Sequence, residues 1–298
     1  MFENVLGHFP RLFQGVVMLL AAITDEISMD LARALDVMKE YDCKAAELRC
    51  VWDKNLVDMD QSEIDQVRKI LDDKQMPVCC LATPLFKCEL GDSSGELGRT
   101  HGAQNRSLME QMELLKKCES LAAVFDTHFI RIFAFWRRGE LTPEIEDRIA
   151  DSIADAVKYA EDKGLVLLME NEHDCYLGTG SDTARFLARF ESPALRSVWD
   201  PGNAFCANEK PFPDGYEAIR NYAVHIHVKD AELLASGRRR FVVVGEGEVN
   251  YKEHFAALKA DNYQGYISLE THYRPYGGTS EQASRLCLQS MNKLLAES

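Results

Sequence analysis

Short apolar runs alternate with amphipathic stretches through nearly the whole chain after residue 20, and this alternation limits the possible folds more than any other feature of the sequence. Each apolar run has the length of one buried strand, and the stretches between the runs repeat their apolar residues at helical spacing. The predicted strands cover 21–27, 44–50, 77–83, 128–135, 165–170, 195–200, 223–229 and 265–270. The predicted helices cover 29–41, 61–74, 105–122, 143–164, 181–190, 251–260 and 280–296. Strands that alternate with helices in this way predict a parallel α/β fold, the (β/α)8 or TIM barrel.

The competing α/β fold is an open doubly wound sheet, which carries a glycine-rich phosphate loop after an early strand. No early strand of this sequence is followed by such a loop, and the nearest match, at 245–248, lies late in the chain. The sequence also has no proline- or serine-rich linker that would separate two domains. We therefore expect one catalytic (β/α)8 barrel domain over residues 18–298.

The residues before the first strand, 1–17, are expected to form an N-terminal extension. The apolar run at 15–23 resembles part of a signal peptide, but Glu3 is acidic, Arg11 is the only basic residue before the run, and no clear cleavage site follows. The run is also too short to span a bilayer. It is best explained as the first barrel strand, which leaves Met18 as a second candidate start of translation.

The overall charge argues against nucleic acids and membranes as binding partners. The chain has a formal net charge of -14 at pH 7, which repels phosphate backbones and anionic lipids. Its 9 cysteines show neither the paired spacing of a zinc ribbon nor the density of a secreted disulfide scaffold. We expect a cytoplasmic protein with reduced thiols that acts on a small molecule, either as a single chain or as a homo-oligomer.

The fifth to eighth predicted strands each end in a side chain that can bind a divalent metal: Glu170, Asp200, His227 and Glu270. A buried charge at a strand end is costly unless it is paired. Because a parallel barrel gathers the carboxyl ends of its strands around one mouth, the four side chains are expected to converge. Three carboxylates and an imidazole suit Mn²⁺ or Mg²⁺ and also accept Co²⁺ or Zn²⁺. The pattern predicts one divalent metal ion at the mouth.

Side-chain parity selects the histidine of this set, since residues two apart on a strand share a face. One face of the seventh strand carries His225, His227 and Lys229 into the barrel, and the other carries Val224, Ile226 and Val228 toward the helices. His227 lies nearer the carboxyl end and is the predicted ligand. His225 lies one layer deeper and is expected to support the site from behind.

Further polar residues near the predicted mouth are candidates for substrate binding. Glu172, in the loop after the fifth strand, can accept a hydrogen bond from a sugar hydroxyl, although exposed acids are common in loops. Lys229 can neutralise an enolate or bind a carboxylate or phosphate, with a structural ion pair as the alternative. Lys87 and Trp136 follow the third and fourth strands, and the indole offers an apolar wall to a sugar ring. Arg274 precedes a glycine pair and the last helix, where a phosphate can bind.

Three more charged residues have inward parity on the second and fourth strands: Glu47, Arg49 and Arg131. Charges inside a barrel need partners of opposite sign. We expect these residues to form a buried ion-pair network instead of acting in catalysis.

The motifs that contain the predicted ligands resemble the xylose-isomerase-like barrel superfamily of sugar and sugar-phosphate isomerases and epimerases, which includes ketose 3-epimerases, hydroxypyruvate isomerase and inosose dehydratase. The resemblance covers about residues 20–296. It is carried, in order, by MENEH (169–173), VWDPGNAF (198–205), VHIHVKD (224–230), GEGEVNY (245–251) and SLETHY (268–273).

The resemblance implies a metal site made of Glu170, Asp200, His227 and Glu270, with the first and last carboxylates also moving protons. The implied reaction is removal of a proton next to a metal-polarised carbonyl to give a cis-enediolate, followed by return of the proton as an epimer or isomer. The carbon on which each glutamate acts is left open. Asn203 stands where many relatives have a histidine, and an amide does not shuttle protons at neutral pH.

We therefore expect a metal-dependent isomerase or epimerase of a sugar, sugar acid or sugar phosphate. A lyase on the same scaffold, either a dehydratase or an enzyme that cleaves C-glycosides, is the alternative that Asn203 keeps open. An endonuclease IV-like DNA repair enzyme is remote, because it needs further histidines and the chain is acidic. A metal-free sugar-binding barrel is opposed by the complete ligand set.

Overall fold

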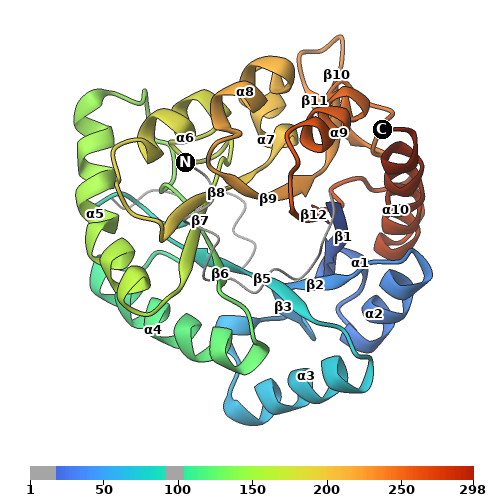
Figure 1. Ribbon diagram of the computed structural model, residues 1–298, viewed down its shortest axis with the longest axis horizontal. Coiled ribbons are helices and arrows are strands. Elements are labelled where there is room, and N and C mark those ends of the chain that lie inside the picture. The colour runs from blue at the N-terminus through green and yellow to red at the C-terminus, as the bar shows by residue number, and fades with distance from the viewer. Residues whose placement is uncertain (1–17, 92–103) are drawn as a thin grey trace.

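Eight parallel strands close into a barrel in the computed structural model, which describes residues 18–91 and 104–298 (Figure 1). The barrel strands are β1 (Met18–Ile23), β2 (Ala45–Leu48), β5 (Val78–Leu85), β6 (Phe129–Ile132), β7 (Val166–Glu170), β8 (Leu195–Trp199), β9 (Ala223–Val228) and β12 (Gly265–Leu269). Around the barrel they follow the order β1-β12-β9-β8-β7-β6-β5-β2. The predicted TIM barrel is confirmed, and the predicted extension, residues 1–17, lies outside the described residues.

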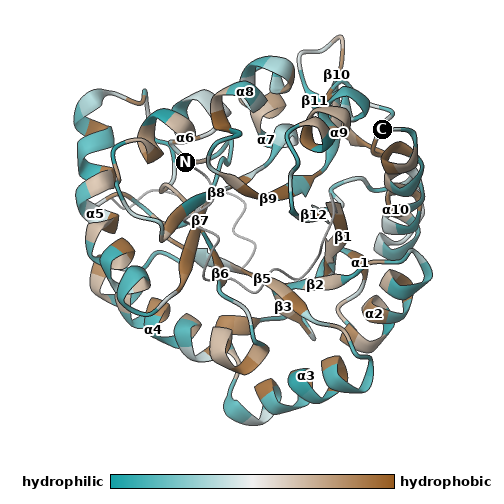
Figure 2. Ribbon diagram, viewed as in Figure 1, coloured by the Kyte–Doolittle hydropathy of each residue, from teal (hydrophilic) through white to brown (hydrophobic). Residues whose placement is uncertain are grey.

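Helices surround the strands, with polar outer faces and apolar faces turned to the barrel (Figure 2). They are α1 (Thr24–Ile27), α2 (Leu31–Glu40), α3 (Gln61–Asp73), α4 (Leu108–Phe125), α5 (Pro143–Asp162), α6 (Gly180–Leu187), α7 (Pro201–Cys206), α8 (Tyr216–Ile219), α9 (Tyr251–Ala260) and α10 (Ser280–Glu297). The short turns η1 (Leu56–Asp58) and η2 (Pro211–Gly215) complete the set. The main apolar core lies between the strands and this ring of helices.

The first strand begins and ends earlier than the sequence predicts. β1 starts at Met18, which pairs with β12, and ends at Ile23. The next four residues form the single helical turn α1, in which Asp25 and Glu26 are buried. Both carboxylates accept hydrogen bonds from Arg49, and this buried ion pair holds the turn in place of an extended strand.

The start of α4 is also corrected, from residue 105 to Leu108. Ser107 is the N-cap and accepts a hydrogen bond from the backbone of Glu110, whose side chain accepts one from the Ser107 backbone. This reciprocal pair satisfies two backbone donors that the first helical turn leaves free. It therefore fixes where the helix begins.

The interior of the barrel holds a small apolar cluster made of Ala21, Ala45, Cys79, Cys80, Val166, Leu168 and Val198. Ile226 and Val228 pack in the outer core, as parity predicts. Outward parity is wrong for Val224, which packs against the interior cluster. The pairing of β8 with β9 shifts register at this level, so the alternation of faces is broken there.

Two hairpins that the sequence did not predict extend beyond the carboxyl ends of the strands: β3 (Cys50–Val51) with β4 (Lys54–Asn55), and β10 (Asp230–Leu233) with β11 (Arg239–Val242). Asp230 accepts hydrogen bonds from the backbone of Gly245, Gly247 and Val249. A Cβ atom on Gly247 would lie 2.2 Å from Asp230 Oδ1, so this position admits only glycine. The glycine-rich segment at 245–248 is thus held against Asp230 by backbone hydrogen bonds and is not a phosphate-binding loop.

Candidate metal centre and active site

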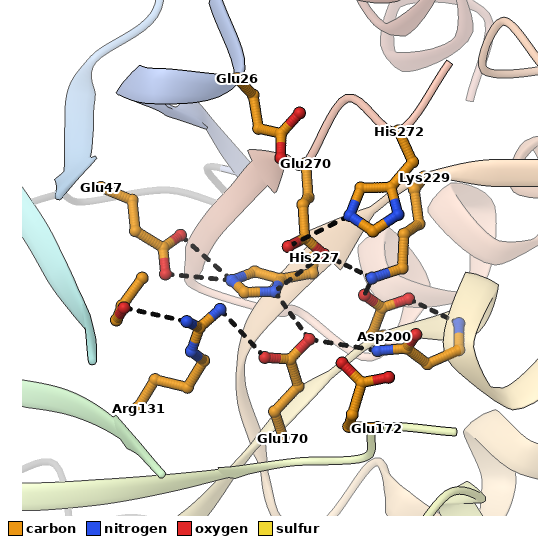
Figure 3. Close-up of polar contacts among 12 residues, drawn as sticks. Glu26, Glu47, Arg131, Glu170, Glu172, Asp200, His227, Lys229, Glu270 and His272 are labelled. Carbon is orange, nitrogen blue, oxygen red and sulfur yellow. Dashed lines mark hydrogen bonds and ion pairs between the residues drawn. The ribbon is translucent and has the colours of Figure 1, made fainter. Parts of the chain in front are cut away.

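The four predicted ligands meet at the carboxyl end of the barrel (Figure 3). One ligand atom of each lies within 4.8 Å of the others, and all four side chains are buried. They come from β7, the residue after β8, β9 and the residue after β12: Glu170, Asp200, His227 and Glu270. The predicted convergence of the strand ends is therefore present in the structure.

The electrostatics of this group fit a divalent cation. Glu170 Oε2 and Asp200 Oδ2 are buried and accept no hydrogen bond from any residue that the structure describes. Among the described residues their partners are two cations at ion-pair distance: Arg131 Nη1 lies 3.2 Å from Glu170 Oε2, and Lys229 Nζ lies 2.8 Å from Asp200 Oδ2. Burial raises the pKa of Asp200 to about 6, even though Lys229 acts against this shift. A buried group of hard carboxylate oxygens suits a divalent metal.

His227 is oriented by Glu47, which lies on β2 across the barrel. Its Nε2 lies 3.0 Å from Glu47 Oε1, and its Nδ1 lies 3.3 Å from Glu170 Oε1. Nδ1 is therefore the nitrogen that faces the ligand group. A carboxylate that accepts from the far nitrogen of a histidine fixes the ring and makes the near nitrogen a better ligand.

His225 supports this arrangement indirectly. Its Nε2 lies 2.9 Å from Glu47 Oε2, so it contacts the carboxylate that holds His227 and no metal-site carboxylate. Burial opposes ionisation of Glu47, but the adjacent His227 and His225 outweigh burial and hold its pKa well below the usual range. Sequence parity placed Glu47 inside the barrel, yet its direct contact with the predicted metal ligand was missed.

Lys229 lies between two of the predicted ligands. Its ammonium forms ion pairs with Asp200 and Glu270. Burial lowers the pKa of Lys229, but these carboxylates reverse the effect and raise it well above the usual range. Close approach of this lysine requires Gly202, where an added Cβ would lie 2.6 Å from Lys229 Cγ. The aliphatic stem and the ammonium are both fixed at the mouth.

The turn after β8 has a local cause in the sequence. Asp200 is the N-cap of α7, and its Oδ1 accepts a hydrogen bond from the backbone of Asn203 at 2.8 Å. Pro201 occupies the first helical position, where a missing N–H costs nothing. Asn171 joins this turn to β7, donating to the Asp200 carbonyl and accepting from the Asp200 backbone. One Asp200 oxygen thus caps a helix while the other faces the metal group.

The buried arginines confirm the predicted ion-pair network and extend it. Arg49 pairs with Asp25 and Glu26 and also lies 3.1 Å from Glu270. Arg131 pairs with Glu170. Because these arginines contact two of the predicted metal ligands, the network belongs to the site and is not separate from it.

A second group of polar side chains continues from the metal group into the loop after β7. Asn203 Nδ2 donates to Glu170 Oε1 at 3.2 Å, and Asn203 Oδ1 lies 3.0 Å from His173 Nδ1. His173 Nδ1 also lies 2.9 Å from Glu172 Oε1. Glu172 is buried and pairs with Lys87 at 3.0 Å, so it is not an exposed loop acid. His173 was not singled out from the sequence, although it belongs to the MENEH segment.

The remaining predicted substrate contacts are already engaged within the protein. Trp136 is buried, and Lys87 Nζ lies 5.2 Å from the centre of its ring. Arg274 is half exposed, pairs with Glu26 at 3.1 Å and donates to two backbone carbonyls. Neither residue contacts the four metal-site residues in the part of the chain that the structure describes. Their role in substrate binding stays a prediction.

Comparison with known proteins places this site in a family. A model of the xylose isomerase-like TIM barrel matches residues 35–294. The chain belongs to this family. Its members include epimerases, isomerases and dehydratases, so the family describes an enzyme scaffold without fixing one reaction.

Three similar proteins illustrate this range. Inosose dehydratase of Bacillus anthracis is 26% identical over 162 residues, 47% of this chain and 52% of the relative. The probable 3-DHS dehydratase of petrobactin synthesis from Bacillus anthracis is 17% identical with a TM-score of 0.71, covering 92% of this chain and 98% of that one. D-allulose 3-epimerase from Methylomonas sp. is 15% identical with a TM-score of 0.68, covering 93% and 96%.

These likenesses have defined limits. The chain spans about half the length of the curated relatives it matches. The two solved structures are too distant in sequence to show more than the shared fold. Separately, none of the described helices is both long and apolar enough to cross a membrane.

Proposed function

We propose that the protein is a metal-dependent enzyme that removes a proton from the carbon next to a carbonyl group of a sugar, sugar acid or sugar phosphate. The observation that carries this proposal is the position of two carboxylates beside one histidine nitrogen. Glu170 lies 3.3 Å and Glu270 4.0 Å from Nδ1 of His227. Two bases at one metal group suit removal and return of a carbon-bound proton.

In this proposal the metal is held by Glu170, Asp200, His227 and Glu270. Mn²⁺ or Mg²⁺ is the first choice and Co²⁺ or Zn²⁺ the second, because oxygen donors dominate. When bound, such an ion polarises a carbonyl and lowers the pKa of the neighbouring C–H bond. His227 would use Nδ1, because Glu47 occupies Nε2.

The side chains of the protein carry out proton transfer, charge stabilisation and substrate binding. Either Glu170 or Glu270 removes the proton to give a cis-enediolate, and the other, in its protonated form, supplies a proton to the enediolate, so that the outcome is an epimer or an isomer; exchange with solvent then restores both groups. The Lys229 ammonium stabilises the negative charge that develops on the substrate oxygen. Glu172 and Asn203 hydrogen-bond substrate hydroxyls, with Lys87, Trp136 and Arg274 as outer contacts.

Dehydration is the second candidate. After the same proton is removed, a hydroxyl on the next carbon can leave instead of a proton returning. The observation in favour is Asn203, which contacts Glu170 but does not act as an acid or a base at neutral pH. The partial likeness to inosose dehydratase agrees with this outcome.

The test is metal analysis of the purified protein followed by NMR of candidate substrates in D₂O. D-allulose represents the ketoses, and an inosose represents the cyclic polyhydroxy ketones. Deuterium entering the carbon next to the carbonyl would support the proposal, and loss of a hydroxyl would identify a dehydratase. A metal-loaded protein that exchanges no proton in any ketose or keto-polyol would overturn it.

A further inference from the structure

The loop after β7 places an imidazole at the edge of the proposed metal group, one amide away from Glu170. His173 has 31% of its side chain exposed, whereas Asn203 beneath it is fully buried. The imidazole is therefore accessible from solvent, whereas the amide that links it to Glu170 is not. The proposed reaction has so far given it no role.

The contacts of His173 fix which of its nitrogens can exchange a proton. Asn203 must present Nδ2 to the Glu170 carboxylate, because a carboxylate only accepts hydrogen bonds. Asn203 Oδ1 then faces His173 Nδ1, as does Glu172 Oε1. With two acceptors at 3.0 and 2.9 Å, Nδ1 holds its hydrogen. Nε2 is left as the nitrogen that gains and loses a proton.

Isomerisation and elimination differ in their need for such a group. Epimerisation or isomerisation moves one carbon-bound proton, which the two glutamates can manage alone. Elimination also expels hydroxide, a poor leaving group, unless an acid protonates it as it departs. General acid catalysis of this kind accelerates a reaction about 10²- to 10⁴-fold.

From this geometry we infer that His173 is the general acid of a β-elimination at this site, which makes a β-hydroxy ketone the substrate class. This inference rests on the proposed function. A glutamate takes the proton from the carbon next to the carbonyl, and the C–H electron pair forms the new C=C bond. The C–O bond to the neighbouring hydroxyl breaks as that oxygen takes the proton from His173 Nε2. Water and an unsaturated ketone leave, the glutamic acid releases the proton it took from carbon to solvent, and solvent returns a proton to His173.

The surroundings of His173 favour its protonated form. Burial lowers its pKa, but Glu172 and Asp174 on its own loop and Asn203 on α7 outweigh burial and raise it above the ordinary value. Asp174 Oδ1 lies 3.8 Å from Nε2. Against the effect of its burial, Lys87 and Lys229 lower the pKa of Glu172. The imidazolium is thus more favoured than in a free histidine side chain.

The experiment compares two rates in the metal-loaded full chain: deuterium exchange next to the carbonyl, and loss of the hydroxyl, both from an inosose in D₂O. The variant H173Q keeps a side-chain amide for Asn203 and Glu172 but cannot act as an acid. We expect its hydroxyl loss to fall about 10²- to 10⁴-fold while exchange stays within a few-fold of the unmodified protein. The control H128Q alters an exposed histidine that precedes β6 at the opposite end of the barrel, and should change neither rate.

Hydroxyl loss in the unmodified protein should also decline as pH rises through the pKa of His173, and H173Q should lack that decline. Equal losses of exchange and elimination in H173Q, or no loss of elimination, would overturn the inference. So would an unmodified protein that exchanges protons in the inosose and in D-allulose without losing a hydroxyl. That last result would leave the proposed proton transfer intact, whereas absence of all exchange would reject the proposed function itself.

Discussion

The two halves of the barrel mouth do different things. Strands β7, β8, β9 and β12 end in the side chains that converge as a metal group, and we call these strands the ligand half. The other four strands, β1, β2, β5 and β6, form the support half. Its residues Glu47, Arg49 and Arg131 contact His227, Glu270 and Glu170 respectively.

The difference shows how a barrel can keep several carboxylates close together. Like charges at this spacing repel one another, and burial makes each of them harder to ionise. From across the barrel, the support half supplies the guanidinium groups of Arg49 and Arg131 and the carboxylate of Glu47, which orients His227. Gathering the carboxylates of the ligand half therefore raises the electrostatic energy of the folded protein. The residues of the support half offset this increase.

The largest effect on activity is expected from the ligand half. E170Q and E270Q should each lower turnover by about 10³-fold or more, because each removes a proposed base and a metal ligand. Steady-state kinetics on a substrate that exchanges deuterium provides the measurement. Each variant also takes a carboxylate partner from a buried cation, Arg131 in E170Q and Lys229 in E270Q, so thermal unfolding of the metal-free variants must be measured to separate a loss of stability from a loss of turnover. Near-normal turnover of either variant would show that the bases are wrongly assigned.

Metal removal should have a comparable effect on activity without any mutation. Dialysis against a chelator is expected to abolish turnover, and added Mn²⁺ or Mg²⁺ to restore it. A metal that binds only the folded protein also raises its melting temperature, and the rise grows with the concentration of free metal. Full activity in protein shown to be metal-free by elemental analysis would contradict the proposed cofactor.

A substitution in the support half should mainly lower the free energy of unfolding. R131M removes the cation beside Glu170 and leaves that buried carboxylate without its ion-pair partner. Loss of one partner of a buried pair lowers the free energy of unfolding by about 3 to 5 kcal/mol. Urea unfolding of metal-free R131M and of the metal-free unmodified protein measures this loss of free energy.

The double variant R131M/E170Q provides the matched control. It should be more stable than R131M alone, because no unpaired charge then remains at the pair. If the second substitution gives no recovery, the ion pair does not explain the loss.

A subtler change in the support half is E47Q, which weakens the contact that orients His227. Such outer contacts typically change metal affinity about 10- to 100-fold. Titration with Mn²⁺ should show this loss, and turnover at saturating metal should recover most of its normal value. An unchanged metal affinity would mean that Glu47 does not orient the ligand.

The smallest effect on activity is expected outside both halves, at His254 of α9. Its Nε2 accepts a hydrogen bond from Trp199 at 2.9 Å, and burial lowers the pKa of its ring to about 3. Because the unfolded value is near 6.5, its neutral form stabilises the fold fully above that pH. This stabilisation is lost as pH falls from 6.5 toward 3.

H254Q keeps an acceptor for Trp199 without a titratable ring. The loss of unfolding free energy between pH 7 and pH 4 should therefore be smaller than in the unmodified protein. H128Q, at an exposed position, is the comparison for replacing a histidine outside the core. If H254Q loses as much stability on acidification as the unmodified protein, His254 does not contribute to the acid sensitivity.

The sequence predicted the ligand half more completely than the support half. The ligands lie at the ends of strands whose apolar residues alternate clearly. The same alternation placed both histidines inside the barrel, and the position of His227 nearer the strand end selected it over His225. Parity also placed Glu47 and Arg131 inside the barrel, but not which ligand each would meet. His227 and Glu47 are 180 residues apart in the chain, and no local pattern reports such a contact.

Irregular backbone explains the other differences. The turn α1 replaced the end of a predicted strand because Asp25 and Glu26 pair with Arg49, which follows a different strand. Val224 changed face because β8 and β9 shift register. Both effects depend on a neighbouring strand, which the local sequence does not describe.

The sequence by itself determined the order of strands and helices, the barrel class and the four side chains that meet at its mouth. These follow from hydrophobic period and from the geometry that all parallel barrels share. Only the tertiary structure decided that Glu47 orients His227, that Lys229 lies between Asp200 and Glu270, and that His173 reaches Asn203. These pairings depend on barrel closure and on side-chain packing across it, which bring together residues that have no local relation in the chain.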